Sequence, residues 1–196
     1  MRYRRDHKPR TRNRIIEKTS LGLRERGIGG LSIPDLMKLA GLTHGGFYNH
    51  FESREALVAA SILFAMNRTT SGWAQLVEGK PENERFDAIV DNYLSSYHRE
   101  DHKNGCVVSA LGADIARASP KLRLAFARQL EAMIVVMAHQ LQTLPAAAAR
   151  ETAMAAFATM VGAIVLARAA GIKMLSEEII SAGRKAVQKG KVGPAA

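Results

Sequence analysis

Apolar side chains recur every three to four positions along almost the whole chain, and no stretch of useful length alternates apolar and polar residues. That spacing is typical of amphipathic α-helices. Proline and glycine fall between the periodic segments, where they mark helix boundaries. We therefore predict an all-α protein of about nine helices, over residues 11–26, 33–40, 44–50, 54 into the seventies, 83–101, 106–118, 120–143, 146–170 and 177–189.

Small hydroxyl side chains stand at many of the predicted helix starts, where they can accept hydrogen bonds from the free N–H groups of a first turn. These candidate caps are Thr11, Ser32, Thr43, Ser53, Ser119 and Ser176. Asp35 follows Ser32 at the spacing of a capping box, and Pro34 is tolerated because a first-turn residue makes no intrahelical N–H bond. Gly27 and Gly41 are expected to end the first two helices.

Residues 32–50 contain two of these short helices, separated by a turn at Gly41. This is the layout of a helix-turn-helix, whose second helix is short enough to enter a DNA major groove. Aromatic and imidazole side chains follow the second hydroxyl cap, and phenol and imidazole groups are good donors to phosphate. The segment therefore predicts a DNA-binding protein.

The charge distribution agrees with this prediction. Residues 1–55 hold 12 Lys and Arg against 6 Asp and Glu, residues 56–183 hold 12 of each, and the tail 184–196 adds 4 cations. A basic N-terminal part on a neutral body suits a module that binds a polyanion and a body that does not. A solubilising excess of positive charge explains the same numbers, so charge alone does not decide.

The sequence also indicates a compartment. A single cysteine cannot form an internal disulfide, which favours a reducing environment, and the polar stretch from Met1 to Arg14 is no secretory signal. The longest apolar run, Ala153 to Ala167, is 15 residues long, and a membrane-spanning helix needs roughly 20. We expect a cytoplasmic protein in which this helix is buried in protein.

The segment from residue 11 to about residue 60 resembles the TetR family of bacterial transcriptional regulators. The matching residues are Ser32, Ala40-Gly41-Leu42-Thr43, Gly45, Phe47-Tyr48, His50-Phe51, Ser53-Arg54-Glu55 and Leu57. The resemblance implies that three N-terminal helices bind operator DNA, while a diverse helical body binds a small-molecule inducer and forms a homodimer. It also implies a repressor, which the inducer releases from the operator.

The resemblance further assigns roles to single residues. Those expected to face the major groove are Thr43, His44, Gly45 and Gly46. Tyr48 and His50 would bond phosphates, and Arg54 would contact the DNA backbone. Asn49 is a further candidate for sequence readout, and Ser32 stands at a helix start that can present N–H groups to a phosphate.

Other residues of this segment are assigned to packing. Those expected beneath the reading helix are Leu36, Leu39, Phe47, Phe51 and Leu57. Two features depart from the family pattern. Gly45-Gly46 doubles a glycine, which costs about 1 kcal/mol of helix stability per residue relative to Ala but lets the backbone approach the bases closely. Lys18 and Gly22 stand where apolar residues are usual, which predicts looser packing of the first helix.

We divide the chain into a disordered basic arm (1–10), a helix-turn-helix domain (11–55), an effector-binding and dimerisation body (56–189) and a disordered tail (190–196). The cations of the arm are Arg2, Arg4, Arg5, Lys8 and Arg10. They can enter an adjacent minor groove, or they can form a solvated tail that adds only nonspecific affinity.

The body contains aromatic and methionine side chains at helical spacing that can line a ligand cavity: Phe64, Trp73, Tyr93, Tyr97, Met133 and Met137. An ordinary packed core explains the same pattern. The segments 146–170 and 177–189 are rich in small residues that permit close helix packing. The resemblance places the dimer bundle there, although burial within one subunit explains these segments equally well.

Cys106 is a further candidate for the ligand pocket. It begins a predicted helix beside Lys103, so N-terminal amide groups can stabilise its thiolate. The arrangement resembles that of TetR-family members that respond to electrophiles or oxidants, and it supports thiol sensing as an alternative function. The competing interpretation is a small buried hydrophobic side chain.

Metal and catalytic sites are not supported. His98, His102 and Cys106 have metal-compatible spacing, but a helix break at Gly105 is expected between them. His50-Phe51-Glu52 matches the His-x-Glu of zinc deaminases, whose Pro-Cys-x-x-Cys partner cannot exist with one cysteine. No phosphate loop, dinucleotide fingerprint or nucleophile elbow is present. We predict a regulator, not an enzyme, without a cofactor; an effector-free DNA-organising protein with the same head is the alternative.

Overall fold

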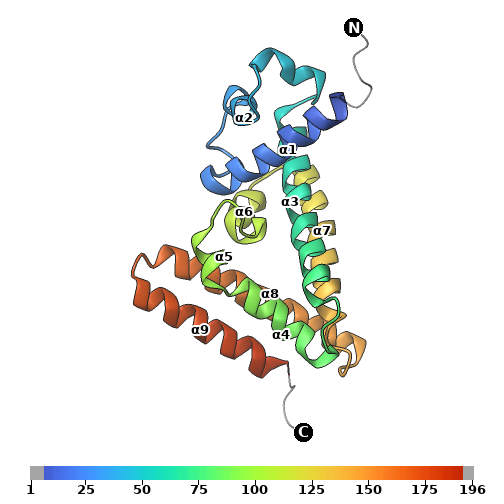
Figure 1. Ribbon diagram of the computed structural model, residues 1–196, viewed down its shortest axis with the longest axis vertical. Coiled ribbons are helices and arrows are strands. Elements are labelled where there is room, and N and C mark those ends of the chain that lie inside the picture. Colours follow the sequence, from blue (N-terminus) through green and yellow to red (C-terminus); the bar gives the residue numbers. More distant parts are fainter. Residues whose placement is uncertain (1–6, 192–196) are drawn as a thin grey trace.

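The computed structural model describes residues 7–191 of the chain, and within this range it is built from helices without strands (Figure 1). The elements are α1 (His7–Arg26), α2 (Ile33–Leu39), the 3-10 helix η1 (His44–Asn49), α3 (Arg54–Val77), α4 (Glu82–Tyr93), α5 (Ser96–Glu100), α6 (Val107–Ala116), α7 (Pro120–Ala138), α8 (Ala146–Ala169) and α9 (Lys173–Gly190). The all-α prediction is confirmed.

The helices form a small head and a larger body (Figure 1). Helices α1, α2 and η1 make the head at one end of the molecule. Helix α3 starts in contact with α1 and runs along the body, where α7 packs beside it. At the other end α8 and α9 pack against each other, and α6 contacts both α1 and α8. Helices α3 and α6 therefore connect the head to the rest of the protein.

The head has its own apolar core. Four of the five residues assigned to packing from the sequence are buried, namely Leu36, Phe47, Phe51 and Leu57. Leu39 is half-buried and packs against them. Burial of an aromatic or leucine side chain contributes roughly 1.5–3 kcal/mol, so these residues hold the short helices α2 and η1 in place. The core assignments are thus confirmed.

Gly22 tightens the head rather than loosening it. A Cβ atom at this position would lie 2.4 Å from Leu39 Cδ1 and 3.1 Å from Leu31 Cδ1. The absence of a side chain therefore lets α1 pack directly against the segment around α2. Lys18 is exposed and leaves this contact undisturbed. The expectation of looser packing was wrong, because the absence of a side chain at Gly22 allows α1 to approach the segment around α2 more closely, although apolar contact area is lost.

Several helix boundaries differ from the prediction. Helix α1 starts at His7, so residues 7–10 are helical and not part of a disordered arm, and Thr11 is not its cap. Arg2, Arg4 and Arg5 lie outside the described residues. Lysine and arginine favour helices, and the basic residues of the arm therefore extend α1 once Ile15 and Ile16 anchor it in the core.

The predicted helix over 83–101 is two helices. Leu94 ends α4, and the hydroxyl of Ser95 accepts a hydrogen bond of 3.1 Å from the His98 amide to start α5. Helix α9 begins at Lys173, and Ser176 is a buried residue inside it instead of a cap. Helix α7 ends at Ala138, before residue 143. Ser95, which caps α5, marks the break in the predicted helix over 83–101, but the apolar spacing continues across it.

Helices α8 and α9 approach each other closely. A Cβ atom at Gly183 would lie 2.8 Å from the Cβ atom of Ala163, so the small residues noted in the sequence do permit tight packing. Of the described helices, only α8 is long and apolar enough to cross a membrane by length and composition, and 39% of its most apolar window is buried in the protein. Met154, Val165 and Leu166 of this helix are exposed.

Candidate nucleic-acid interface and body pocket

Helix η1 presents a polar edge on a buried anchor. Phe47 is fully buried, whereas His44, Tyr48 and Asn49 are exposed, Tyr48 to 68%. The Tyr48 ring meets the edge of Phe47 at 5.1 Å between centroids, which holds the phenol in place. Three of the predicted DNA-contacting side chains therefore stand on one short, well-anchored helix.

Thr43 and the double glycine form the start of this helix. Thr43 is in an extended conformation and its hydroxyl makes no capping hydrogen bond, so the predicted cap is absent and the exposed hydroxyl faces solvent. A Cβ atom at Gly45 would have nothing within 4 Å, and one at Gly46 only the Met37 Cε at 3.7 Å. Packing within the chain therefore does not demand these glycines, which agrees with a backbone that approaches another molecule.

Ser32 is engaged in a complete capping box. Its hydroxyl accepts a hydrogen bond from the Asp35 amide at 3.3 Å, and the Asp35 carboxylate accepts one from the Ser32 amide at 2.9 Å. The bonds from Ser32 lower the pKa of Asp35. Ser32 remains exposed at the helix start, but its hydroxyl already has a partner.

Arg54 has a structural task that the sequence did not reveal. Its Nε and Nη2 donate to the carbonyl oxygen of Leu31 at 3.1 and 2.9 Å, and Nη2 also donates to the carbonyl of Ile28. These bonds join the start of α3 to the turn between α1 and α2. With two of its three nitrogens so engaged, only Nη1 is left for the predicted contact with a DNA phosphate.

Other basic residues lie near the head's surface. The Arg12 guanidinium lies over the Phe51 ring at 4.8 Å, and Lys8 and Arg10 are exposed on the first turns of α1. His50 ends η1, where its amide donates to the Phe47 carbonyl at 2.9 Å. The cations of α1 are therefore fixed on a helix, not carried on a loose arm.

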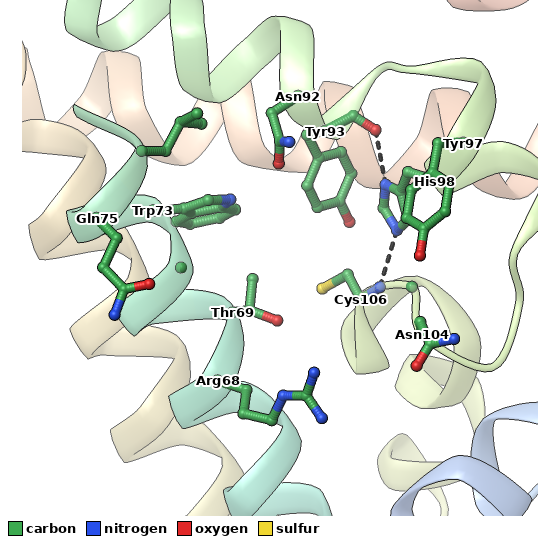
Figure 2. Close-up of a pocket in the computed structure, with 13 residues that line it drawn as sticks. Arg68, Thr69, Trp73, Gln75, Asn92, Tyr93, Tyr97, His98, Asn104 and Cys106 are labelled. Atoms are coloured by element: carbon green, nitrogen blue, oxygen red, sulfur yellow. Dashed lines mark hydrogen bonds between the residues drawn. The ribbon is translucent and has the colours of Figure 1, made fainter. Parts of the chain in front are cut away.

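The body contains a pocket of about 460 Å³ beside α3 (Figure 2). Helix α3 supplies one wall, and the facing wall comes from the end of α4, from α5 and from the connection before α6. The lining residues are Arg68, Thr69, Gly72, Trp73, Gln75, Leu76, Asn92, Tyr93, Tyr97, His98, Asn104, Gly105 and Cys106. No carboxylate is among them. The volume is in the range of small-molecule sites.

Aromatic rings form the floor of this pocket. Trp73 and Tyr93 are buried, with ring centroids 6.1 Å apart, and both pack on Phe157 of α8 at 5.8 and 5.9 Å. Four predicted lining residues, including Tyr97 and Cys106, do reach the pocket. Phe64, Met133 and Met137 do not line it; the two methionines are fully buried in the core. Helical spacing alone could not separate lining from core.

His98 organises the wall opposite α3. Its Nδ1 donates to the Tyr93 carbonyl at 2.6 Å, and its Nε2 accepts from the Cys106 amide at 2.8 Å (Figure 2). Burial lowers the pKa of His98 to about 4, so the imidazole is neutral. Arg168 of α8 donates to the His98 carbonyl at 2.5 Å. From the sequence, His98 was a candidate only for a metal site, and its role in joining α4 to the connection before α6 was missed.

Cys106 is buried, and burial raises the pKa of its thiol. Its amide is used by His98, and the nearby Lys103 pairs with Glu25 of α1 at 3.0 Å. The environment therefore stabilises the thiol and not the thiolate, contrary to the sequence expectation. Within residues 7–191 no group of His, Cys, Asp and Glu side chains is arranged to hold a metal ion.

Two contacts join this part of the body to the head. The Asp114 carboxylate of α6 accepts a hydrogen bond of 2.9 Å from the Ile28 amide, 86 residues away in the chain. Gly27, with φ of +76°, places its own Cα beside the same carboxylate, since a Cβ atom there would lie 3.1 Å from Asp114 Oδ2. The turn after α1 is thus held from one side by α6 and from the other by Arg54.

Comparison with known proteins matches both parts of the chain to family models. Residues 15–61 match bacterial regulatory proteins of the tetR family, and residues 83–174 match the C-terminal domain of LmrA/YxaF-like transcriptional regulators. An HTH-type transcriptional regulator of Mycobacterium tuberculosis is 26% identical over 165 residues, which are 80% of this chain and 84% of the relative. NemR, a transcriptional repressor of Escherichia coli, is 25% identical over 60% of each chain.

Solved structures share the arrangement of head and body. The reduced form of E. coli NemR superposes with a TM-score of 0.76 at 20% identity, covering 92% of this chain and 96% of that one. A TetR transcriptional regulator from Chloroflexus aurantiacus superposes with a TM-score of 0.77 at 25% identity, covering 93% and 96%. The likeness therefore extends over almost the whole of each fold.

Proposed function

The chain belongs to the TetR family of bacterial transcriptional regulators, and on that premise we propose that it is a repressor released from one operator by a small molecule in the body pocket. It is a DNA-binding regulator with a helix-turn-helix head. The observation that carries the proposal is the pocket of about 460 Å³ between α3 and the connection into α6, two helices that contact α1 of the head. We further propose that it acts in the bacterial cytoplasm.

Helix η1 is the proposed reading element. His44 and Asn49 are exposed on it and can bond base edges, and Tyr48 can donate to a phosphate. Gly45 lets the backbone come close to the bases, so readout depends on few side chains and on DNA shape. The exposed cations of α1 add affinity that does not depend on sequence.

Release requires that the effector binds a non-DNA-binding arrangement more tightly than the DNA-binding one. The pocket lies between α3 and the connection that leads into α6, and these are the helices that contact α1. An effector that shifts α6 would move Asp114, and with it the Ile28 turn of the head. The pocket and the reading helix are thereby linked through a short series of contacts.

The proposed dimer forms through α8 and α9. Their exposed large apolar residues, with the residue before α9, are Met154, Val165, Leu166, Ile172, Met174 and Leu175. So large an apolar surface on two adjacent helices fits burial against a second copy. A two-fold dimer can place its two reading helices about 34–36 Å apart, as successive major grooves require.

The alternatives are less well supported. Thiol sensing needs an accessible thiolate, whereas Cys106 is buried and its pKa is raised. An effector-free DNA-organising protein has no use for an open pocket with a defined aromatic floor. Because the family consists of transcriptional regulators, an enzymatic role is not proposed.

The test is a binding selection from bacterial genomic DNA that includes the region upstream of the gene itself. We expect one operator, bound at least a thousandfold more tightly than random fragments at the same salt concentration, and repression of a reporter placed behind it. Equal affinity for most fragments would instead favour the DNA-organising function. Activation of the reporter would refute the repressor assignment and leave the operator intact.

A further inference from the structure

Two arginines without acidic partners lie at the side of the body pocket that faces the head. Arg68 of α3 lines the pocket, and its guanidinium extends toward the connection before α6 (Figure 2). Arg24 of α1 is 9% exposed, and its Nε is buried without a hydrogen-bond partner among the described residues. Within residues 7–191 neither guanidinium forms an ion pair, whereas the nearby cation Lys103 has Glu25.

The two cations are close enough to oppose each other. Burial, followed by the charge of Arg68, lowers the pKa of Arg24 to about 10. Asp101 is the one carboxylate whose charge acts on Arg24, and it already accepts hydrogen bonds from the Asn104 amide and side chain at 3.1 and 2.8 Å. A buried cation without a counter-ion is costly. Arg24 does not line the pocket, but its charge adds to that of Arg68 at this end.

The opposite end of the pocket is apolar and aromatic. Trp73 and Tyr93 form its floor, and the neutral His98 adds no charge. The lining also includes amide side chains, those of Gln75, Asn92 and Asn104, which can bond polar substituents. A ligand that satisfies both ends has one or two rings at one end and a single planar anion at the other.

We infer that the effector is a small aromatic carboxylate, whose anion binds Arg68 with Arg24 behind it and whose ring packs on Trp73 and Tyr93. This rests on the proposed function and names the chemical class of the molecule that the pocket takes. A guanidinium matches a carboxylate because two parallel N–H groups meet two oxygens. The anion would also neutralise the repulsion between α1 and α3, so binding changes the contact between head and body.

Trp73 gives a direct assay, because it is the only tryptophan in the sequence and lines the pocket. The full-length protein is titrated with benzoate, 4-nitrobenzoate and 1-naphthoate while Trp73 fluorescence is followed, and 4-nitrobenzamide serves as the neutral counterpart of 4-nitrobenzoate. We expect saturable quenching by 4-nitrobenzoate with a Kd at least tenfold below that of 4-nitrobenzamide. Equal affinities, or no saturable change with any of the three carboxylates, would overturn the inference.

Variants locate the anion. Arg68→Gln is expected to raise the Kd of 4-nitrobenzoate at least tenfold and to leave the Kd of 4-nitrobenzamide unchanged. Arg68→Lys should raise the Kd of 4-nitrobenzoate less. Arg128→Gln, an exposed arginine on α7, is the matched control and should bind as the unaltered protein does. Because Arg68 is itself exposed, its replacement should not unfold the protein, and circular dichroism verifies this. Unchanged affinity in Arg68→Gln would refute the site.

The proposed function can fail independently. The fluorescence assay contains no DNA, so carboxylate binding without release of the operator would refute the release mechanism and support the ligand class. Conversely, release of a selected operator by a neutral compound that competes for Trp73 would support the release mechanism and refute the carboxylate.

Discussion

At the scale of single residues, Tyr48 and Tyr97 have the same exposure in different settings. Both are 68% exposed; Tyr48 is on η1 of the head, and Tyr97 is on α5 of the body. Because the two side chains are equally exposed, comparing their Phe variants distinguishes the loss of a DNA contact from the general effect of losing a surface hydroxyl.

Tyr48→Phe is expected to weaken binding to operator and random DNA alike, by about three- to tenfold, because one hydrogen bond to phosphate contributes about 1 kcal/mol. His44→Ala should weaken operator binding more than random binding, because it removes a base contact. The dissociation constants for operator and for random DNA are measured by fluorescence anisotropy at fixed salt, with Tyr97→Phe as the control. Equal losses in His44→Ala on both DNAs would contradict its role in sequence readout.

His98 illustrates how burial converts a titratable group into a structural one. Its pKa in the folded state is about 4, whereas the pKa of a histidine in an unfolded chain is near 6.5. The unfolded state therefore binds more protons between these values, and stability present above pH 6.5 is lost as the pH falls toward 4. The full difference is roughly 3 kcal/mol.

We therefore expect the free energy of unfolding from urea titrations to decline between pH 6.5 and 4. In His98→Gln the decline should be smaller by about the amount assigned to His98, although the variant is less stable at pH 7. His139→Gln removes an exposed histidine and should retain the whole decline. An identical pH profile in His98→Gln and the unaltered protein would show that another group is responsible.

At the scale of elements, α6 joins pocket and head. Its first residues follow Cys106 at the pocket, and Asp114 near its end bonds the Ile28 amide. An element that touches both sites can transmit a shift without a chain of intermediate residues. This requires that the hydrogen bond be intact in the DNA-binding arrangement.

Asp114→Ala leaves the half-buried Ile28 amide without its partner, at a cost of about 1–3 kcal/mol. We expect operator binding to be weakened severalfold and its sensitivity to effector to be reduced by at least fivefold, in titrations of operator-bound protein with 4-nitrobenzoate. Asp114→Asn keeps an acceptor and should restore most of the coupling. Asp91→Ala removes the α4 carboxylate that pairs with Arg184 at 3.1 Å and serves as control; full effector sensitivity in Asp114→Ala would exclude this route.

At the scale of the whole molecule, the exposed apolar surface of α8 and α9 is the proposed dimer contact. Leu166 of α8 is 60% exposed and Leu124 of α7 is 58% exposed. The two leucines are therefore equally accessible, but only Leu166 belongs to the proposed dimer surface.

Leu166→Glu is expected to yield monomers at micromolar concentration, because the dimer would bury two carboxylates in an apolar contact. Operator affinity should fall at least a hundredfold as the second head is lost, and binding to random DNA should fall much less. Light scattering after size exclusion measures the mass. Leu124→Glu should remain a dimer; a dimeric Leu166→Glu protein would place the interface elsewhere.

The sequence by itself determined the all-α fold and most of the head, because caps, turns and amphipathic spacing act over three or four residues. The capping box of Ser32 and the burial of Phe47 follow from such local rules. The tertiary structure alone decided the rest. Only the packed structure shows that Trp73 lines the pocket whereas Met133 is in the core. It also places Arg24 near Arg68. The bonds from Arg54 to the carbonyls of Ile28 and Leu31 likewise follow from tertiary packing.

Such contacts join residues that lie far apart in the chain: Arg54 and Leu31 are 23 positions apart, and Asp114 and Ile28 are 86 positions apart. Periodicity states which face of a helix is apolar, but it contains no information on which other helix that face will meet. The charge at the pocket, the neutral imidazole of His98 and the proposed coupling through α6 all depend on contacts between helices. These properties follow only from the tertiary structure, because they arise where residues of different helices come into contact.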